Sequence, residues 1–204
     1  KLPEEHVRIL SNAAAACRAG VNRCHVLNRD CDGVILSELF TRDGAGILVT
    51  QEPYEQTRTA TIDDVGGILE LIQPLEQAGV LVKRSRERLE QEIGRFQVVE
   101  RDGGIIACAA LYPFHRERIG ELACLAVHDD YRNEGRGDAL LQAVEHRAVR
   151  DGIRQLVVLT TRTAHWFRER GFLPGDLSHL PARKKALYNY QRNSKVFFKV
   201  LDQA

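Results

Sequence analysis

Residues 121–148 constrain the fold more than any other part of the chain. They read ELACLAVHDDYRNEGRGDALLQAVEHRA, which is an apolar run, then a glycine-containing turn, then apolar residues at helical spacing. We predict a buried strand, a turn at Arg132, Gly135 and Gly137, and an amphipathic helix. Backbone N–H groups at such a helix start attract anions, and glycine leaves the main chain open to a phosphate. The glycines could also only shape the turn, because short glycine motifs are weak signals.

Length and charge limit the classes of function. At 204 residues the chain can hold one full domain and part of another. Its net charge of +1 creates no long-range field for nucleic acid or for an anionic membrane. No apolar run approaches the roughly 20 residues of a membrane span, and no signal peptide is visible. We therefore expect a cytoplasmic protein, and we expect a fragment or a processed piece because the chain has no methionine.

The five cysteines predict reduced thiols and no metal site. They are an odd number, none forms a CxxC pair, and their spacings match no metal-ligand pattern.

The distribution of apolar and polar residues along the chain predicts two structural units joined by a polar linker at residues 52–56. For the first unit, residues 1–56, the sequence predicts a helix at 3–19, strands at 24–28 and 47–51, and either a strand or a helix at 33–40. It is too short for an independent core. For the second unit, residues 57–204, the sequence predicts first a strand at 57–62, a helix capped by Thr61 and Asp64, a helix at 85–94, and strands at 96–102, 105–114 and 118–127. After these it predicts a helix following Gly137, a strand at 154–161, a helix at 163–171 and a strand at 195–201.

This order, with the Arg132-x-x-Gly135-x-Gly137 turn, resembles the GNAT acetyltransferases. The resemblance implies an α/β fold with a mixed, largely antiparallel sheet flanked by helices, and it implies acetyl-CoA as co-substrate. The pyrophosphate would meet the main chain from Arg132 to Gly137, including Arg136. The pantetheine would pair with the preceding strand at Cys124, Leu125, Ala126 and Val127.

Glu121 is the candidate general base. It is the only carboxylate in its apolar run, and an amine must lose a proton before it can attack a thioester. A solvated glutamate at a strand end is an equally open interpretation. Cys124 is conceivable as a nucleophile, but no basic residue lies near it in sequence, so we predict a structural or backbone role.

The general acid is less clear from sequence. Many GNAT enzymes place a tyrosine where this chain has Trp166 and Phe167. Both aromatic side chains are expected in the core, so Thr160 and Thr161 are the nearest candidate hydroxyls.

Two basic groups suggest a carboxylate-binding site. Arg192 and Ser194 share one side of an extended segment, and a second group, VKRSRER, occupies residues 82–88. Arginine binds carboxylates in bidentate fashion, so two such groups suit a small substrate with two carboxylates. Both groups could instead be solvated surface.

Several runs resemble the acetyltransferase half of the bacterial, fused N-acetylglutamate synthases. They are LVKRSRERLEQEI, IACAALYPF, IGELACLAVHDDYR, LTTRTAHWFRERGF and LYNYQRNSK, and they extend over about residues 57–204. The resemblance implies that Arg84 and Arg192 bind the side-chain carboxylate of L-glutamate and that Ser194 helps hold its backbone end. It also implies that Glu121 is the base, with Thr160 close to the reacting centre.

Residues 1–56 resemble the end of the amino-acid-kinase-like domain of the same family, through GVNRCHVLN and SELFTRDGAG. The resemblance implies that L-arginine, as an inhibitor, binds at His25, Glu38 and Gly44. Gly46-Ile47 departs from the Gly-Thr that often follows this turn. A simple structural sheet edge is the alternative interpretation.

The resulting hypothesis is an enzyme that transfers acetyl from acetyl-CoA to the α-amino group of L-glutamate by direct attack in a ternary complex. It would open arginine biosynthesis and be inhibited by arginine, with no metal, as a homo-oligomer such as a dimer or hexamer. One alternative is a GNAT enzyme for another amine. The other is a non-catalytic amino-acid sensor.

Overall fold

The computed structural model describes residues 3–41, 44–51, 53–186, 188–189 and 194–201. The chain divides into two compact units, Lys1–Tyr54 and Glu55–Ala204. Among the described residues, none of the helices has the length and apolar character that crossing a bilayer requires.

The first unit is small and built around one antiparallel strand pair. Cys17 is buried, and its Sγ donates a hydrogen bond to the carbonyl of Val49 at 3.3 Å. The segment 33–40, which the sequence left open between strand and helix, is a helix. The elements are α1 (Glu4–Arg18), β1 (Arg23–Val26), α2 (Val34–Phe40) and β2 (Ile47–Thr50), and β1 pairs with β2.

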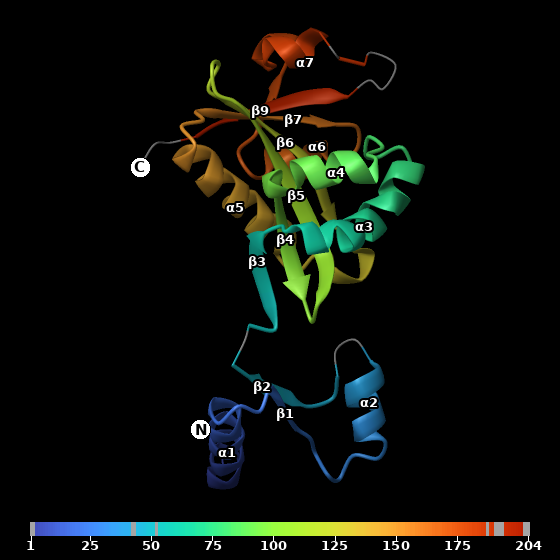
Figure 1. Cartoon of the computed structure of the whole chain (residues 1–204), viewed down its shortest axis with the longest axis vertical. Coiled ribbons are helices and arrows are strands. Elements are labelled where there is room, and N and C mark those ends of the chain that lie inside the picture. The colour runs from blue at the N-terminus through green and yellow to red at the C-terminus, as the bar shows by residue number, and fades with distance from the viewer. Residues whose placement is uncertain (1–2, 42–43, 52, 187, 190–193, 202–204) are drawn as a thin grey trace. The chain divides into compact units, whose positions relative to one another are not determined.

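The second unit contains a seven-stranded sheet in the order β3-β4-β5-β6-β7-β9-β8 (Figure 1). The β6–β7 pair is parallel and the other neighbouring pairs are antiparallel, which confirms the predicted mixed, largely antiparallel sheet. The elements are β3 (Glu55–Thr59), α3 (Val65–Gln77), α4 (Arg86–Glu92), β4 (Phe96–Arg101), β5 (Gly104–Phe114), β6 (Ile119–Val127), α5 (Arg136–Arg150), β7 (Gln155–Thr160), α6 (Ala164–Arg168), β8 (Leu173–Gly175), α7 (Ala182–Ala186) and β9 (Lys195–Val200).

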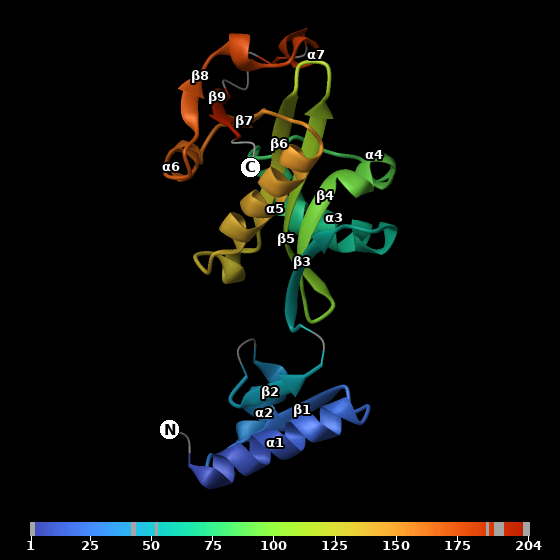
Figure 2. The same cartoon turned by 90° about the vertical axis from the view of Figure 1, so that its left-hand side faces the viewer.

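Helices cover both faces of this sheet. Successive side chains of β5 point to opposite faces, so this strand contributes apolar residues to both. One set packs in the same core cluster as Leu140 and Val144 of α5, and it consists of Ala107, Ala109 and Leu111. The other set packs in the same core cluster as Ile68 and Ile72 of α3, and it consists of Cys108, Ala110 and Tyr112. Figures 1 and 2 show α3 and α4 on one face and α5 on the other.

Three features differ from the sequence prediction. Glu55 and Gln56 belong to β3 and not to the linker. The helix predicted at 163–171 is the shorter α6. The short elements β8 and α7 were not predicted, because three and five residues are too few to establish a periodic pattern.

The predicted capping pair is present at the start of the 3₁₀ turn that leads into α3. Thr61 and Asp64 form a capping box, and Asp64 is buried with 7% exposure. Arg58 binds the Asp64 carboxylate with two hydrogen bonds, at 2.6 and 2.8 Å. The hydrogen bond from Arg58 lowers the pKa of Asp64.

Replacing Asp64 with alanine should lower the free energy of unfolding by about 2 kcal/mol, because it removes charge-assisted hydrogen bonds from a buried position. Asp63→Ala, at the exposed neighbouring position, is the control and should have little effect. The lowered pKa means that Asp64 contributes stability above its unfolded pKa of about 4 and loses it as the pH falls through the folded-state value. Urea unfolding at pH 7 and at acidic pH measures both effects, and equal losses in the two variants would contradict the expectation.

Candidate active site

The centre of the site is the point where β6 and β7 separate. Their parallel pairing ends at Leu122 and Val158, although β6 continues to Val127 and β7 to Thr160. Along residues 123–127, that side of β6 therefore has no ladder partner within the described part of the chain. Unpaired main-chain groups of this kind can accept an extended ligand as an added strand. This stretch includes the predicted Cys124–Val127 segment.

A β-bulge alters β6 at the same point. The pairing register with β5 shifts between Cys108 and Ala110, and Cys124 adopts a positive φ of 53°. Ala123 and Cys124 consequently both pack on the α3 side of the sheet, where strict alternation would separate them. The bulge thus changes the direction of the main chain beside the unpaired edge.

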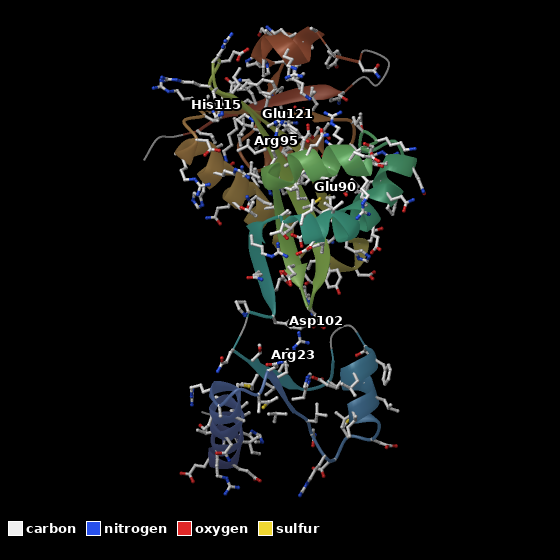
Figure 3. All side chains as sticks on the ribbon, in the orientation of Figure 1. Arg23, Glu90, Arg95, Asp102, His115 and Glu121 are labelled. Atoms are coloured by element: carbon white, nitrogen blue, oxygen red, sulfur yellow. The ribbon has the colours of Figure 1, made fainter. Side chains whose placement is uncertain are left out.

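Glu121 is a buried carboxylate within the sheet (Figure 3). It pairs with Tyr112 of β5 on one side and with Val157 of β7 on the other, and it is 6% exposed. The interpretation as a solvated strand-end glutamate is therefore wrong. Its Oε2 lies 2.6 Å from Nζ of Lys184 on α7, but the ammonium approaches outside the hydrogen-bonding direction. Among the described residues, this oxygen has no hydrogen bond.

Arg84 belongs to the same region and was predicted to bind substrate. It is half-buried, its main-chain N–H donates to Glu76 at 2.9 Å, and its guanidinium donates to the carbonyl of Val82 at 3.1 Å. Burial lowers the pKa of Arg84, but the neighbouring Cys124 and Tyr112 outweigh that effect, and the pKa is raised overall. The guanidinium therefore remains charged beside the bulge.

The structure adds a basic neighbour to Cys124, whose predicted structural or backbone role stays a prediction. The sequence shows no basic residue near it, whereas the fold brings Arg84 close. A hydrogen bond from Cys108 and the charge of Arg84 lower the pKa of Cys124, and burial opposes them. Tyr112 has a pKa raised to about 12 by burial and by its hydrogen bond to Glu92, at 2.7 Å. Tyr112 is therefore a protonated hydroxyl at neutral pH.

The predicted phosphate turn leads directly into α5. Gly135 precedes the helix with a φ of 80°, and a side chain there would meet nothing within 4 Å. Gly137 is required by packing, because a Cβ on it would lie 3.0 Å from the ring of Trp166. The contact of its main chain with a pyrophosphate stays a prediction. Gly135 thus permits the turn and leaves it open, whereas Gly137 lets Trp166 approach the helix.

Side chains at the turn neutralise its acidic residues. Arg136 is 7% exposed, and its guanidinium binds Glu55, at 2.7 and 2.9 Å, and also Glu134. Only the main chain of Arg136 is therefore suited to meet a ligand. Arg132 remains about half exposed and forms an ion pair with Asp129 at 2.6 Å.

Asp138 is the acidic residue in the first turn of α5, and it is also paired. Arg170 binds both of its carboxylate oxygens, at 2.5 and 3.0 Å, and stacks 3.9 Å above the ring of Trp166. The hydrogen bond from Arg170 lowers the pKa of Asp138. Because its carboxylate charge is compensated, the positive end of the α5 dipole can still attract an anion.

The remaining predicted residues of this site have local hydrogen bonds. Thr160 Oγ1 lies 2.8 Å from the hydroxyl of Thr163 and accepts the Thr163 N–H at 3.1 Å. The carbonyl of Ser194 accepts a hydrogen bond from Tyr188 at 2.6 Å. Phe167 lies in the core, and Trp166 packs against it, as expected. Arg192 lies outside the described residues.

The three residues predicted for an effector lie together in the first unit. His25 Nδ1 is 2.5 Å from Glu38 Oε1, and the other carboxylate oxygen accepts the N–H groups of Ala45 and Gly46, at 2.6 and 2.8 Å. The hydrogen bond from His25 lowers the pKa of Glu38. A Cβ on Gly44 would stand 2.5 Å from the same carboxylate. Glu38 thus orders the glycine turn, and arginine binding there stays a prediction.

Lys184 is the residue that sequence reasoning missed. It lies in the sequence LPARKKALYNYQRNSKVFF at residues 180–198, which is rich in basic residues, but nothing in this sequence marks α7 as a helix that reaches Glu121. No cluster of three metal-binding side chains occurs in the described part of the chain. All five cysteines are free thiols, and Cys31 is the exposed one among them.

Comparisons with known proteins agree with this geometry. The family described as acetyltransferase (GNAT) domain matches residues 92–174. An amino-acid acetyltransferase of Azotobacter vinelandii is 64% identical over 193 residues, which cover 95% of this chain and 45% of that protein. An amino-acid acetyltransferase of Pseudomonas aeruginosa is 61% identical over 193 residues, which again cover 95% of this chain and 45% of that protein. The chain therefore spans less than half the length of these curated relatives.

Solved structures extend the comparison. N-acetylglutamate synthase from Neisseria gonorrhoeae, complexed with coenzyme A and L-arginine, matches with a TM-score of 0.87 and 39% identity, covering 98% of this chain and 46% of that one. A structure of that synthase with coenzyme A and N-acetyl-glutamate matches with a TM-score of 0.70 and 40% identity, covering 98% and 48%. A GNAT superfamily phosphinothricin acetyltransferase from Sinorhizobium meliloti, at 17% identity, a TM-score of 0.57 and coverage of 74% and 91%, shows the fold alone. The second unit therefore has the GNAT acetyltransferase fold, with the family match at residues 92–174, and the chain is similar to a stretch that makes up 45% of an amino-acid acetyltransferase.

Proposed function

We propose that the chain transfers acetyl from acetyl-CoA to the α-amino group of L-glutamate, giving N-acetyl-L-glutamate and CoA. The observation that carries this proposal is the buried Glu121 carboxylate next to the unpaired edge of β6. The two synthase structures, with coenzyme A and with arginine or N-acetyl-glutamate, support the same substrates.

In this proposal, different parts of the site bind different parts of acetyl-CoA. The open turn at Gly135 and the start of α5 offer N–H groups to the diphosphate. The unpaired main chain of residues 123–127 pairs with the pantetheine and brings the thioester towards Glu121. Glu121 takes the proton of the acceptor ammonium, the neutral amine attacks the thioester carbonyl, and the CoA thiolate leaves and takes up a proton.

Arg84 gives selectivity for an acidic acceptor in this proposal. Its charged guanidinium lies beside Cys124 and Tyr112 on the same face of the sheet as Glu121. Arg192 and Ser194 would complete the binding of the two carboxylates. L-Arginine would act at His25, Glu38 and Gly44, and the reaction would open arginine biosynthesis.

Replacing Arg84 with alanine should raise the KM for glutamate about 10–100-fold, the equivalent of losing a charged hydrogen bond of roughly 1.5–3 kcal/mol, and should leave the KM for acetyl-CoA nearly unchanged. Steady-state kinetics on the full chain measures both constants. Arg86→Ala is the matched control, because Arg86 is an exposed arginine on α4 that pairs with Glu90 at 2.9 Å.

A panel of acceptor amines tests the substrate directly. CoA release is measured with glutamate, aspartate, glutamine and an aliphatic amino acid. Turnover of the other acceptors without turnover of glutamate would overturn the substrate assignment. Equal effects of Arg84→Ala on both KM values would remove Arg84 from the acceptor site.

A further inference from the structure

We propose that Lys184 is a second acetyl acceptor, so that the chain acetylates its own Lys184 ε-amino group when no free acceptor is bound. This inference rests on the proposed function, since it uses acetyl-CoA as donor and Glu121 as base. It adds a covalent modification site on α7 to the site described above.

The contact between Lys184 and Glu121 is the first observation. Nζ lies 2.6 Å from Oε2, which is within the distance over which a general base takes a proton. A primary ammonium from the protein therefore occupies the position, relative to Glu121, that the proposed reaction requires of the acceptor ammonium.

The geometry of this contact differs from that of an ordinary structural ion pair. A buried carboxylate normally receives a directed hydrogen bond from its cation. Here Glu121 has a side chain 7% exposed, and its Oε2 has no hydrogen bond among the described residues although Lys184 is so close. The contact is thus an ion pair in which the ammonium makes no directed hydrogen bond to this oxygen.

The neighbours of Lys184 on α7 show that the placement is selective. The side chain of Lys184 is 34% exposed, whereas Arg183 and Lys185 are exposed residues on the same five-residue helix. One lysine of α7 is therefore directed towards the base, and the adjacent one faces solvent. This difference predicts acetylation at one position and not at the other.

The reaction balances with acetyl-CoA alone. Glu121 accepts a proton from the Lys184 ammonium, and the neutral nitrogen attacks the thioester carbonyl carbon. A C–N bond forms and the C–S bond breaks. The CoA thiolate leaves and is protonated to CoA, and the product is Nε-acetyl-lysine at position 184.

The same geometry predicts competition between Lys184 and a free acceptor. Both need the Glu121 carboxylate, so a bound amino acid displaces the lysine and protects it. Acetylation removes the positive charge of Lys184 and leaves a bulkier amide in front of Glu121. The modified chain should therefore turn over free acceptor more slowly.

The test is to incubate the full chain with acetyl-CoA without an amino acid and to map acetylated peptides by mass spectrometry. We expect at least about ten times more acetylation at Lys184 than at Lys185, because Lys184 contacts Glu121 and Lys185 is exposed. Lys184→Arg should lose the signal, and Lys185→Arg should keep it. Excess glutamate should suppress acetylation at Lys184 but not at exposed lysines.

Equal acetylation of Lys184 and Lys185 in the protein without substitutions would overturn the inference. This comparison does not depend on the folding of any variant. Glu121→Gln with undiminished labelling of Lys184 would also overturn it. Formation of N-acetylglutamate is measured in a separate reaction. Glutamate turnover without Lys184 labelling rejects the inference alone, whereas labelling without glutamate turnover rejects the proposed acceptor alone.

Discussion

Replacing Glu121 with glutamine should lower kcat by about 10²–10⁴-fold, the usual contribution of a general base. Glutamine keeps the size of the side chain in a position that is 6% exposed, but it cannot take the proton of the acceptor ammonium. The KM for acetyl-CoA should change little, because the turn at Gly135 and the unpaired main chain of residues 123–127 are intact. Initial-rate kinetics with both substrates varied gives these constants.

Glu87→Gln is the matched control, because Glu87 is an exposed carboxylate in the first turn of α4. It should retain the parent kcat. Urea unfolding of Glu121→Gln separates a loss of chemistry from a loss of fold. A folded Glu121→Gln variant with a kcat close to the parent value would remove Glu121 from the mechanism.

Replacing Gly135 with alanine should weaken acetyl-CoA binding by about 5–30-fold, because the left-handed conformation costs a side-chain-bearing residue about 1–2 kcal/mol. Gly135 has a φ of 80° immediately before α5, so the turn must distort to relieve the strain. Distortion there turns N–H groups away from the diphosphate. Titration calorimetry with CoA measures the change.

The other end of α5 supplies the matched control. Gly152 has a φ of 76°, and, like Gly135, it has no atom within 4 Å of the Cβ that a substitution would add. Gly152→Ala should therefore cost similar stability while leaving CoA affinity unchanged. A Gly135→Ala variant that binds CoA as tightly as Gly152→Ala does would exclude the turn from the cofactor site.

The local sequence pattern was sufficient to predict most helices and strands of the second unit. The apolar residues at helical spacing before residue 148 predicted an amphipathic helix, and on α5 its apolar face is buried, with Leu140, Leu141, Val144 and Ala148. The Thr61 and Asp64 pair predicted a helix start that the structure contains. These features depend on residues within a few positions of one another, so their periodicity and capping are visible in the sequence.

Short or ambiguous elements could not be predicted in the same way. Val34–Phe40 mixes β-branched residues with leucine and glutamate, and its helical state was not decided by propensity. The helix α7 is too short to show an apolar period. The packing of Trp166 beside Gly137 was also not predicted, because Trp166 belongs to another helix.

The sequence by itself predicted the order of the longer strands and helices, the glycine turn before α5, and the position of a carboxylate in β6. The binding of an anion at this turn stays a prediction. Only the tertiary structure decided that Glu121 is buried, that Arg84 lies beside Cys124, and that Lys184 reaches Glu121. The reason is physical. Periodicity and turn chemistry are local properties of a chain, whereas burial and the meeting of charges depend on which distant segments the packed sheet brings together.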